Sequence, residues 1–185
     1  MSRKRFHSKT PTADKVRREG QASFQETSKG TYSIRQNDRK VRIVTEDWEE
    51  ANHSGKGIIL HTIDGLLVGK FGMFEHNGTW TIYNRRIEDG FKGYNLGKLG
   101  FRLAEQVARQ NKGSVIRMYT NQTDVISTAL SIGYKFDRKE DKEAIKEALG
   151  IPPNEPLPNN QKLLEKLHDK FAETSPHSVW LSRQL

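Results

Sequence analysis

Two dipeptides that favour tight hairpin turns, Asp64-Gly65 and Asn77-Gly78, separate three runs with the composition of β-strands. The runs cover residues 57–62, 66–74 and 80–87. Because each turn is so short, consecutive strands must pair with one another and run in opposite directions. The sequence therefore predicts a three-stranded antiparallel meander near the middle of the chain.

After the meander the pattern changes to alternating helices and strands. A glycine-rich loop at residues 88–97 leads into a predicted helix at 96–110, where Leu99, Leu103 and Val107 recur every four residues. A strand, a helix, a short strand, two helices and a last strand are predicted at residues 114–120, 124–132, 134–136, 139–149, 161–171 and 179–181. We expect an α+β fold with a mixed sheet and one parallel crossover.

Before the meander the signals are shorter. They predict strands at residues 32–35 and 40–44 and brief helices at residues 13–19 and 45–48. Residues 1–30 hold eight basic and three acidic residues, a net charge of +5 out of +8 for the whole chain. We expect a basic, flexible arm there, which either contacts nucleic acid or an acidic partner weakly or is simply solvated.

Composition excludes several classes of protein. The chain has no cysteine, so disulfides, cysteine nucleophiles and thiolate metal sites are ruled out. No two of its six histidines have the i, i+4 spacing of a helical metal site, and no nucleophile elbow of the form G-x-S-x-G is present. No apolar run approaches the roughly 18 residues that span a bilayer. These features favour a cytoplasmic protein without a metal.

The glycine-rich loop is the most informative motif. A strand that enters such a loop and continues as a helix often binds anions, because loop amides and the positive helix end converge on phosphate oxygens. Residues 93–99 miss the spacing of a P-loop, and Leu99 cannot hold Mg²⁺. Glycines 93, 97 and 100 do not fit the G-x-G-x-x-G dinucleotide motif either.

The loop resembles the acetyl-coenzyme A loop of the GNAT N-acetyltransferases, in which valine, an aromatic residue and Arg/Gln-x-x-Gly-x-Gly/Ala precede a helix. Ile87 takes the valine place and Phe91 the aromatic place. Lys92 takes the Arg/Gln place and Gly97 that of the last glycine. Asn95 stands where the middle glycine belongs, and asparagine is among the few residues that tolerate a positive φ.

The resemblance extends over residues 57–136. The meander is similar to the family's second to fourth strands, and Asn121 followed by Gly133-Tyr134 is similar to its Asn…Gly-Phe ending. The resemblance implies a GNAT-like domain at residues 31–185, with an antiparallel meander, splayed central strands and flanking helices. A helical, proline-containing insertion at about residues 139–177 would precede the last strand. The alternative is an unrelated α+β domain with a tight turn at the loop.

The resemblance implies an N-acetyltransferase that transfers an acetyl group from acetyl-coenzyme A to a primary amine. The acceptor could be a protein, a peptide, an aminoacylated RNA or a small molecule. The residues implied in coenzyme binding follow the family loop: Ile87, Lys92, Gly93, Tyr94, Asn95, Leu96, Gly97 and Lys98.

The sequence departs from the family at both proton-transfer positions. Thr81 stands where many members have the Glu base, and Ala129 where many have the Tyr acid. Tyr83 and Tyr119 are the candidate catalytic substitutes, with packing on a strand as the alternative role of each.

Two acids of the loop, Glu88 and Asp89, could act as bases or be solvated turn residues. The departures leave a second function open. It is a non-catalytic GNAT-like structural or interaction protein, whose basic arm contacts nucleic acid or an acidic partner.

Overall fold

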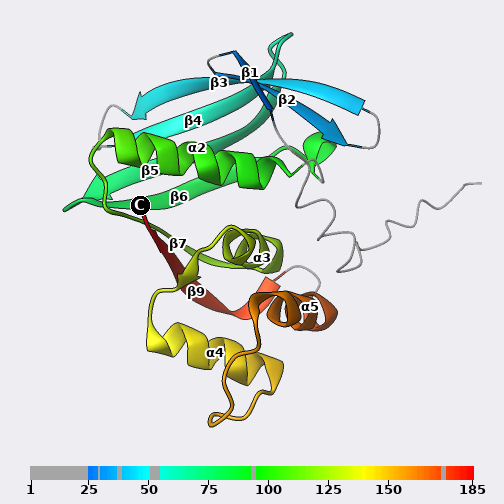
Figure 1. Ribbon diagram of the computed structural model, residues 1–185, viewed down its shortest axis with the longest axis vertical. Helices are drawn as coiled ribbons and strands as arrows, with labels where there is room; N and C mark the ends of the chain where they lie inside the picture. The colour runs from blue at the N-terminus through cyan, green and yellow to red at the C-terminus, as the bar shows by residue number, and fades with distance from the viewer. Residues whose placement is uncertain (1–24, 29, 37–38, 51–54, 93–94, 172–173) are drawn as a thin grey trace, which may run out of the picture.

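The computed structural model describes residues 25–28, 30–36, 39–50, 55–92, 95–171 and 174–185. These residues form one mixed sheet with helices packed beside it (Figure 1). The helix predicted at residues 13–19 lies outside the described part of the chain, as does most of the basic arm.

The predicted meander is confirmed. Its strands are β4 (Gly55–Thr62), β5 (Leu67–His76) and β6 (Thr79–Ile87), each antiparallel to the next. Asn77 and Gly78 have φ angles of 50° and 76°, the left-handed values that a two-residue hairpin turn of this type requires.

Three further strands extend the sheet beyond β4: β1 (Gln25–Ser28), β2 (Thr31–Gln36) and β3 (Arg39–Glu50). The helix predicted at residues 45–48 is wrong, because these residues belong to β3. The pairing of β3 with β4 extends from Ile43 opposite Thr62 to Glu50 opposite Gly55, and so includes residues 45–48. This long-range pairing satisfies the backbone and overrides the weak local preference for a helix.

The chain then crosses over the sheet. Helix α2 (Leu96–Gln110) connects β6 to the parallel strand β7 (Val115–Gln122), as predicted. Helix α2 lies over β4, β5 and β6 (Figure 1). The close approach depends on Gly100, where a Cβ atom would overlap the ring of Phe71 on β5.

The remaining elements are α3 (Thr123–Ser131), β8 (Lys135–Phe136), α4 (Lys139–Leu149), α5 (Asn160–Lys170) and β9 (Thr174–Gln184). Within the described residues the sheet has nine strands, in the order β1-β2-β3-β4-β5-β6-β7-β9-β8. Strand β9 lies between β7 and β8 and is antiparallel to both. None of the described helices is long and apolar enough to cross a membrane.

Candidate active site

The two central parallel strands, β6 and β7, separate partway along their length. Their pairing begins at Thr79 opposite Val115 and ends at Ile82 opposite Met118. Beyond this point β6 continues to Ile87 and β7 to Gln122. The cleft between them has a volume of about 360 Å³. The splayed central strands expected from the sequence are therefore present.

A β-bulge on β6 stands at the start of the cleft. Met73 of β5 lies opposite Ile82, whereas the preceding Gly72 lies opposite Asn84. Tyr83 is the extra residue between these two pairs. A bulge of this kind bends its strand and increases its twist, which moves the end of β6 away from β7.

The two faces of the sheet carry different side chains at the cleft. Phe71 faces α2, so Gly72, the next residue, faces the opposite side. A Cβ atom on Gly72 would meet the ring of Tyr83, which places Tyr83 on that opposite face. Arg85 pairs with Phe71 and so lies on the α2 face.

Arg85 crosses the cleft on the α2 face. Its Nη2 donates to Gln122 Oε1 at 2.8 Å and to Thr120 Oγ1 at 3.4 Å, both on β7. Burial lowers the pKa of this guanidinium to about 10, and Asp124 partly opposes the shift. Arg85 is therefore still a cation at neutral pH, and its side-chain hydrogen bonds to Thr120 and Gln122 go to neutral acceptors.

Both candidate catalytic tyrosines line this cleft, one on each strand. Tyr83 exposes 46% and Tyr119 54% of its surface. Tyr119 packs against Trp180 of β9, with the ring centroids 5.0 Å apart. Parallel pairing of β6 with β7 brings these residues together, although they are 36 positions apart in the sequence.

The side chains at the family's proton-transfer positions have structural roles. Thr81 is buried and accepts a hydrogen bond from Arg117 Nε at 3.2 Å. Ala129 is fully buried in α3. Neither side chain is a useful proton donor or acceptor for an amine or a thiolate.

The two acidic loop residues are engaged with neighbouring cations. Glu88 pairs with Arg86 at 2.9 Å, and Asp89 pairs with Lys92 at 2.7 Å. The hydrogen bond from Lys92 lowers the pKa of Asp89, which makes this exposed carboxylate a weaker base. Both residues lie outside the lining of the cleft.

The start of α2 has an unusual N-cap. Asn95 has φ 57° and ψ 19°, the left-handed conformation that its place in the loop motif predicts. Its carbonyl oxygen accepts from the N–H groups of Lys98 at 3.0 Å and Leu99 at 3.3 Å. The N–H groups of Leu96 and Gly97 come earlier in the first turn, where a helix has no internal acceptors.

Gly97 leaves space beside this first turn. A Cβ atom there would lie 3.7 Å from Thr128 Cγ2, an ordinary van der Waals contact. Packing within the protein therefore does not demand a glycine at this position, in contrast to Gly100. Leu96 is buried, and burial and the charge of Arg102 lower the pKa of Lys98.

The other predicted coenzyme-binding residues take different positions. Ile87 pairs with Gly69 and packs against the core. The Lys92 side chain is 67% exposed. Gly93 and Tyr94 lie outside the described residues.

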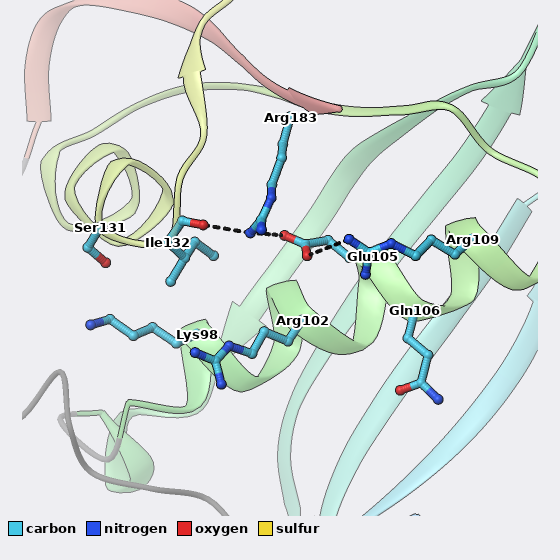
Figure 2. Close-up of a pocket in the computed structure, with 8 residues that line it drawn as sticks. All are labelled: Lys98, Arg102, Glu105, Gln106, Arg109, Ser131, Ile132 and Arg183. Atoms are coloured by element: carbon cyan, nitrogen blue, oxygen red, sulfur yellow. Dashed lines mark hydrogen bonds and ion pairs between the residues drawn. The ribbon is translucent and has the colours of Figure 1, made fainter. Parts of the chain in front are cut away.

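A basic groove of about 740 Å³ extends along α2 from its first turn (Figure 2). It is lined by Lys98, Arg102, Glu105, Gln106, Arg109, Ser131, Ile132 and Arg183. Glu105, the one acid among the described residues of this lining, accepts a hydrogen bond from Arg183 Nη1 at 3.1 Å. The groove thus carries an excess of positive charge beside the N-terminal end of α2.

Arg85, Gln122, Arg102 and Arg183 are not among the site residues that the sequence predicts. A signal for Arg85 does exist, because Asn84 and two arginines interrupt the apolar residues of the third meander strand before Ile87. The positions of Gln122 and Arg183 depend on long-range pairing of β7 with β9, which no local pattern reveals.

Comparison with known proteins identifies the architecture. Neither a protein-family model nor a curated protein sequence matches this chain. Solved structures do match it, and one is the IAA acetyltransferase of Bacillus cereus. The TM-score is 0.53 at 14% identity, over 77% of this chain and 99% of the other.

Two further structures were solved with a coenzyme. The Bacillus subtilis acetyltransferase in complex with CoA gives a TM-score of 0.53 at 15% identity, covering 77% of this chain and 99% of the other. A GNAT family acetyltransferase from Elizabethkingia anophelis with acetyl-CoA bound gives a TM-score of 0.50 at 12% identity. The match covers 77% of this chain and 98% of the other. The chain has the GNAT fold.

The GNAT fold accounts for the meander, the splayed strands and the crossover helix. It also confirms the resemblance seen in the sequence of residues 57–136. Among the residues that the structure describes, no group of three or more His, Asp or Glu side chains is placed to hold a metal ion.

Proposed function

We propose that this protein is an acyltransferase that uses acetyl-coenzyme A and an amine acceptor. The observation that carries the proposal is the relation between two features. The left-handed Asn95 opens the first turn of α2, and the β6–β7 cleft begins in the strand that leads into this loop. One feature supplies N–H donors for a pyrophosphate, and the other supplies a slot for an extended chain.

The residues present fit the coenzyme. Leu96 and Gly97 offer first-turn N–H groups, and the missing side chain at Gly97 leaves room for close approach. Lys98 and Arg102 add positive charge in the adjoining groove. When bound, acetyl-coenzyme A supplies a thioester whose carbonyl carbon an amine can attack.

The chemistry needs two proton movements. The amine nitrogen forms a bond to the acetyl carbon while the carbon–sulfur bond breaks. The nitrogen loses one proton, and the leaving thiolate gains one. We assign the second transfer to a tyrosine hydroxyl, from Tyr83 or Tyr119, because these are the tyrosines that line the cleft.

Among the described residues that line the cleft, none has a carboxylate to serve as the base. An acceptor that is already partly neutral avoids this need. At pH 7.5 an α-amino group with a pKa near 7.8 is roughly one-third neutral, whereas a lysine side chain near 10.4 is only about 0.1% neutral. The proposal therefore favours an α-amino group or an aromatic amine over a lysine side chain.

A second function is supported by Thr81 and Ala129. Both stand at positions that often carry the family's acid and base, and neither can transfer a proton. The second function is a non-catalytic GNAT-like module. Such a module would not transfer the acetyl group, whether or not it binds the coenzyme.

Calorimetric titration of the folded protein with acetyl-coenzyme A tests the proposal. We expect saturable binding in the micromolar to millimolar range. Release of free thiol in the presence of α-amino acceptors then separates an enzyme from a binding module. An absence of heat at millimolar ligand would rule out the coenzyme and with it the acyltransferase.

A further inference from the structure

The face of the cleft opposite α2 carries two half-exposed aromatic rings. Tyr83 and Tyr119 stand on neighbouring strands and expose 46% and 54% of their surface. Single exposed aromatics are common on proteins, but here two line one cleft. Their shared position indicates a surface for a planar ligand.

Each ring is held in place by another aromatic side chain. Tyr83 lies 5.8 Å from Phe74, with an angle of 43° between the rings. The ring centroids of Tyr119 and Trp180 are 5.0 Å apart, with an angle of 34° between the ring planes. The Cζ atom of Arg117 lies 4.7 Å from the centroid of the Trp180 ring. Rings that are already oriented lose little entropy when a ligand stacks on them.

The cleft as a whole carries positive charge. Of the residues that the structure describes, Ile82, Tyr83, Asn84, Arg85, Tyr119, Thr120, Asn121, Gln122 and Ser178 line the cleft, and they include one cation and no acid. Arg86, the next residue along β6, has a side chain that is 65% exposed and pairs with Glu88. A lining of this kind disfavours polycationic acceptors and favours an anionic one.

The neutral lining residues are also informative. Asn84 and Asn121 bring two amide side chains to the cleft, whereas the side-chain oxygen of Gln122 accepts a hydrogen bond from Arg85. An amide can donate and accept, which suits the edges of nucleobases. Stacking rings, amides and arginines together form the combination with which proteins bind single-stranded nucleic acid.

We propose that this face binds a nucleotide of a single-stranded RNA. A base stacks on Tyr83 and Tyr119, and the adjoining phosphate lies towards Arg86, which is on the same face of the sheet. The acceptor amine is then carried by the RNA, close to the stacked base. This last point rests on the proposed acetyl transfer, whereas RNA binding does not require it.

The test measures binding of a fluorescently labelled RNA of six nucleotides to the full chain by anisotropy, without acetyl-coenzyme A. Loss of one stacked ring weakens binding roughly 5- to 150-fold, so we expect this for Tyr83→Ala and for Tyr119→Ala. Tyr83→Phe and Tyr119→Phe keep the ring and should bind within about twofold of the parent. Melting curves show that each variant is folded.

The matched control is Leu66→Ala, which removes a side chain that is 58% exposed in the turn before β5. It should leave RNA affinity unchanged. A second control replaces Arg3, Lys4 and Arg5 with alanine and tests the basic arm. A loss of binding in this variant but not in the tyrosine variants would overturn the proposal.

Two other results would also overturn it. One is an absence of RNA binding at millimolar protein. The other is equal, tyrosine-dependent binding of an acidic hexapeptide, which would assign the face to an acidic protein partner. RNA binding that depends on the tyrosines, together with no heat from acetyl-coenzyme A, would support this site and reject the acetyl transfer.

Discussion

Arg85 and Gln122 connect the two strands of the cleft beyond the point where they separate. The Arg85 guanidinium donates to the Gln122 side-chain oxygen at 2.8 Å, although β6 and β7 no longer pair there. The described residues place no carboxylate in an ion pair with Arg85. The hydrogen-bond partners of this buried cation are neutral, and the Coulomb attraction of Asp124 offsets its desolvation only in part.

This relationship predicts an order of stabilities. Gln122→Ala should lower the free energy of unfolding by about 1 kcal/mol, because it removes an acceptor and leaves the cation in place. Arg85→Met should lower the free energy of unfolding by a smaller amount, or raise it, because this change removes the cation itself. Denaturant unfolding of both variants checks the order. A larger loss in Arg85→Met would show that the guanidinium is a net stabiliser.

Gly97 and Gly100 lie one turn apart in α2 and should respond oppositely to substitution. Gly97→Leu should leave the fold intact, because a Cβ atom there makes only an ordinary contact with Thr128. It should abolish acetyl-coenzyme A binding in calorimetry by filling the proposed phosphate cradle.

Gly100→Ala is the matched change within the same helix. Its Cβ atom would overlap Phe71, so we expect a loss of about 1–3 kcal/mol in stability. At temperatures where this variant is folded, coenzyme affinity should be close to that of the parent. Unchanged binding in Gly97→Leu would contradict the proposed cradle.

The elements that sequence predicted best are those with local causes. Helix α2 begins and ends where the spacing of Leu99, Leu103 and Val107 places it. The left-handed Asn95 follows from its place in the loop, because asparagine tolerates a positive φ. In these cases the residues themselves contain the physical reason.

The features that sequence missed have distant causes. Residues 45–48 form part of β3 because they pair with β4, not because of their own preference. Arg85 reaches Gln122 only because the strands splay after Ile82. Tyr83 and Tyr119 were singled out as catalytic candidates, but the parallel pairing that brings them to one cleft is a property of the sheet.

The assignment of the proton donor predicts a difference between the two cleft tyrosines. Tyr83→Phe and Tyr119→Phe each remove one hydroxyl and keep the ring. The variant that lacks the donor should lose roughly 10²- to 10⁴-fold in kcat, with the KM for acetyl-coenzyme A unchanged. Tyr134→Phe, which changes a buried tyrosine outside the cleft, is the control. Full kcat in both cleft variants would exclude a tyrosine donor.

Glu105 predicts a dependence of stability on pH. Burial raises the pKa of this carboxyl, with Arg183 and Arg109 opposing the shift. The folded state therefore binds a proton more readily than the unfolded state, whose pKa lies near 4.5. As pH rises through the window just above 4.5, the contribution of Glu105 to stability falls.

Glu105→Gln removes this titration. The melting temperature of the variant minus that of the parent should become more positive as pH increases from 4 to 7. Gln106→Ala, at an exposed neighbouring position, should show a difference that does not change with pH. A difference for Glu105→Gln that falls with pH would mean that Arg183 and Arg109 outweigh the burial of the carboxylate.

The basic arm predicts a dependence of duplex DNA binding on salt. Residues 1–30 carry a net charge of +5, and if all five charges met phosphates the log–log slope would be about −4 to −5. Replacing Arg3, Lys4 and Arg5 with alanine should make the slope shallower by about 2 to 3. Acetyl-coenzyme A affinity should be unchanged, since the proposed cradle lies some 90 residues further along the chain.

The control replaces Lys139, Lys142 and Lys166, three exposed lysines of α4 and α5, and removes the same charge elsewhere. Equal slopes for the two triple variants would show that the arm is solvated and that the binding depends on net charge alone.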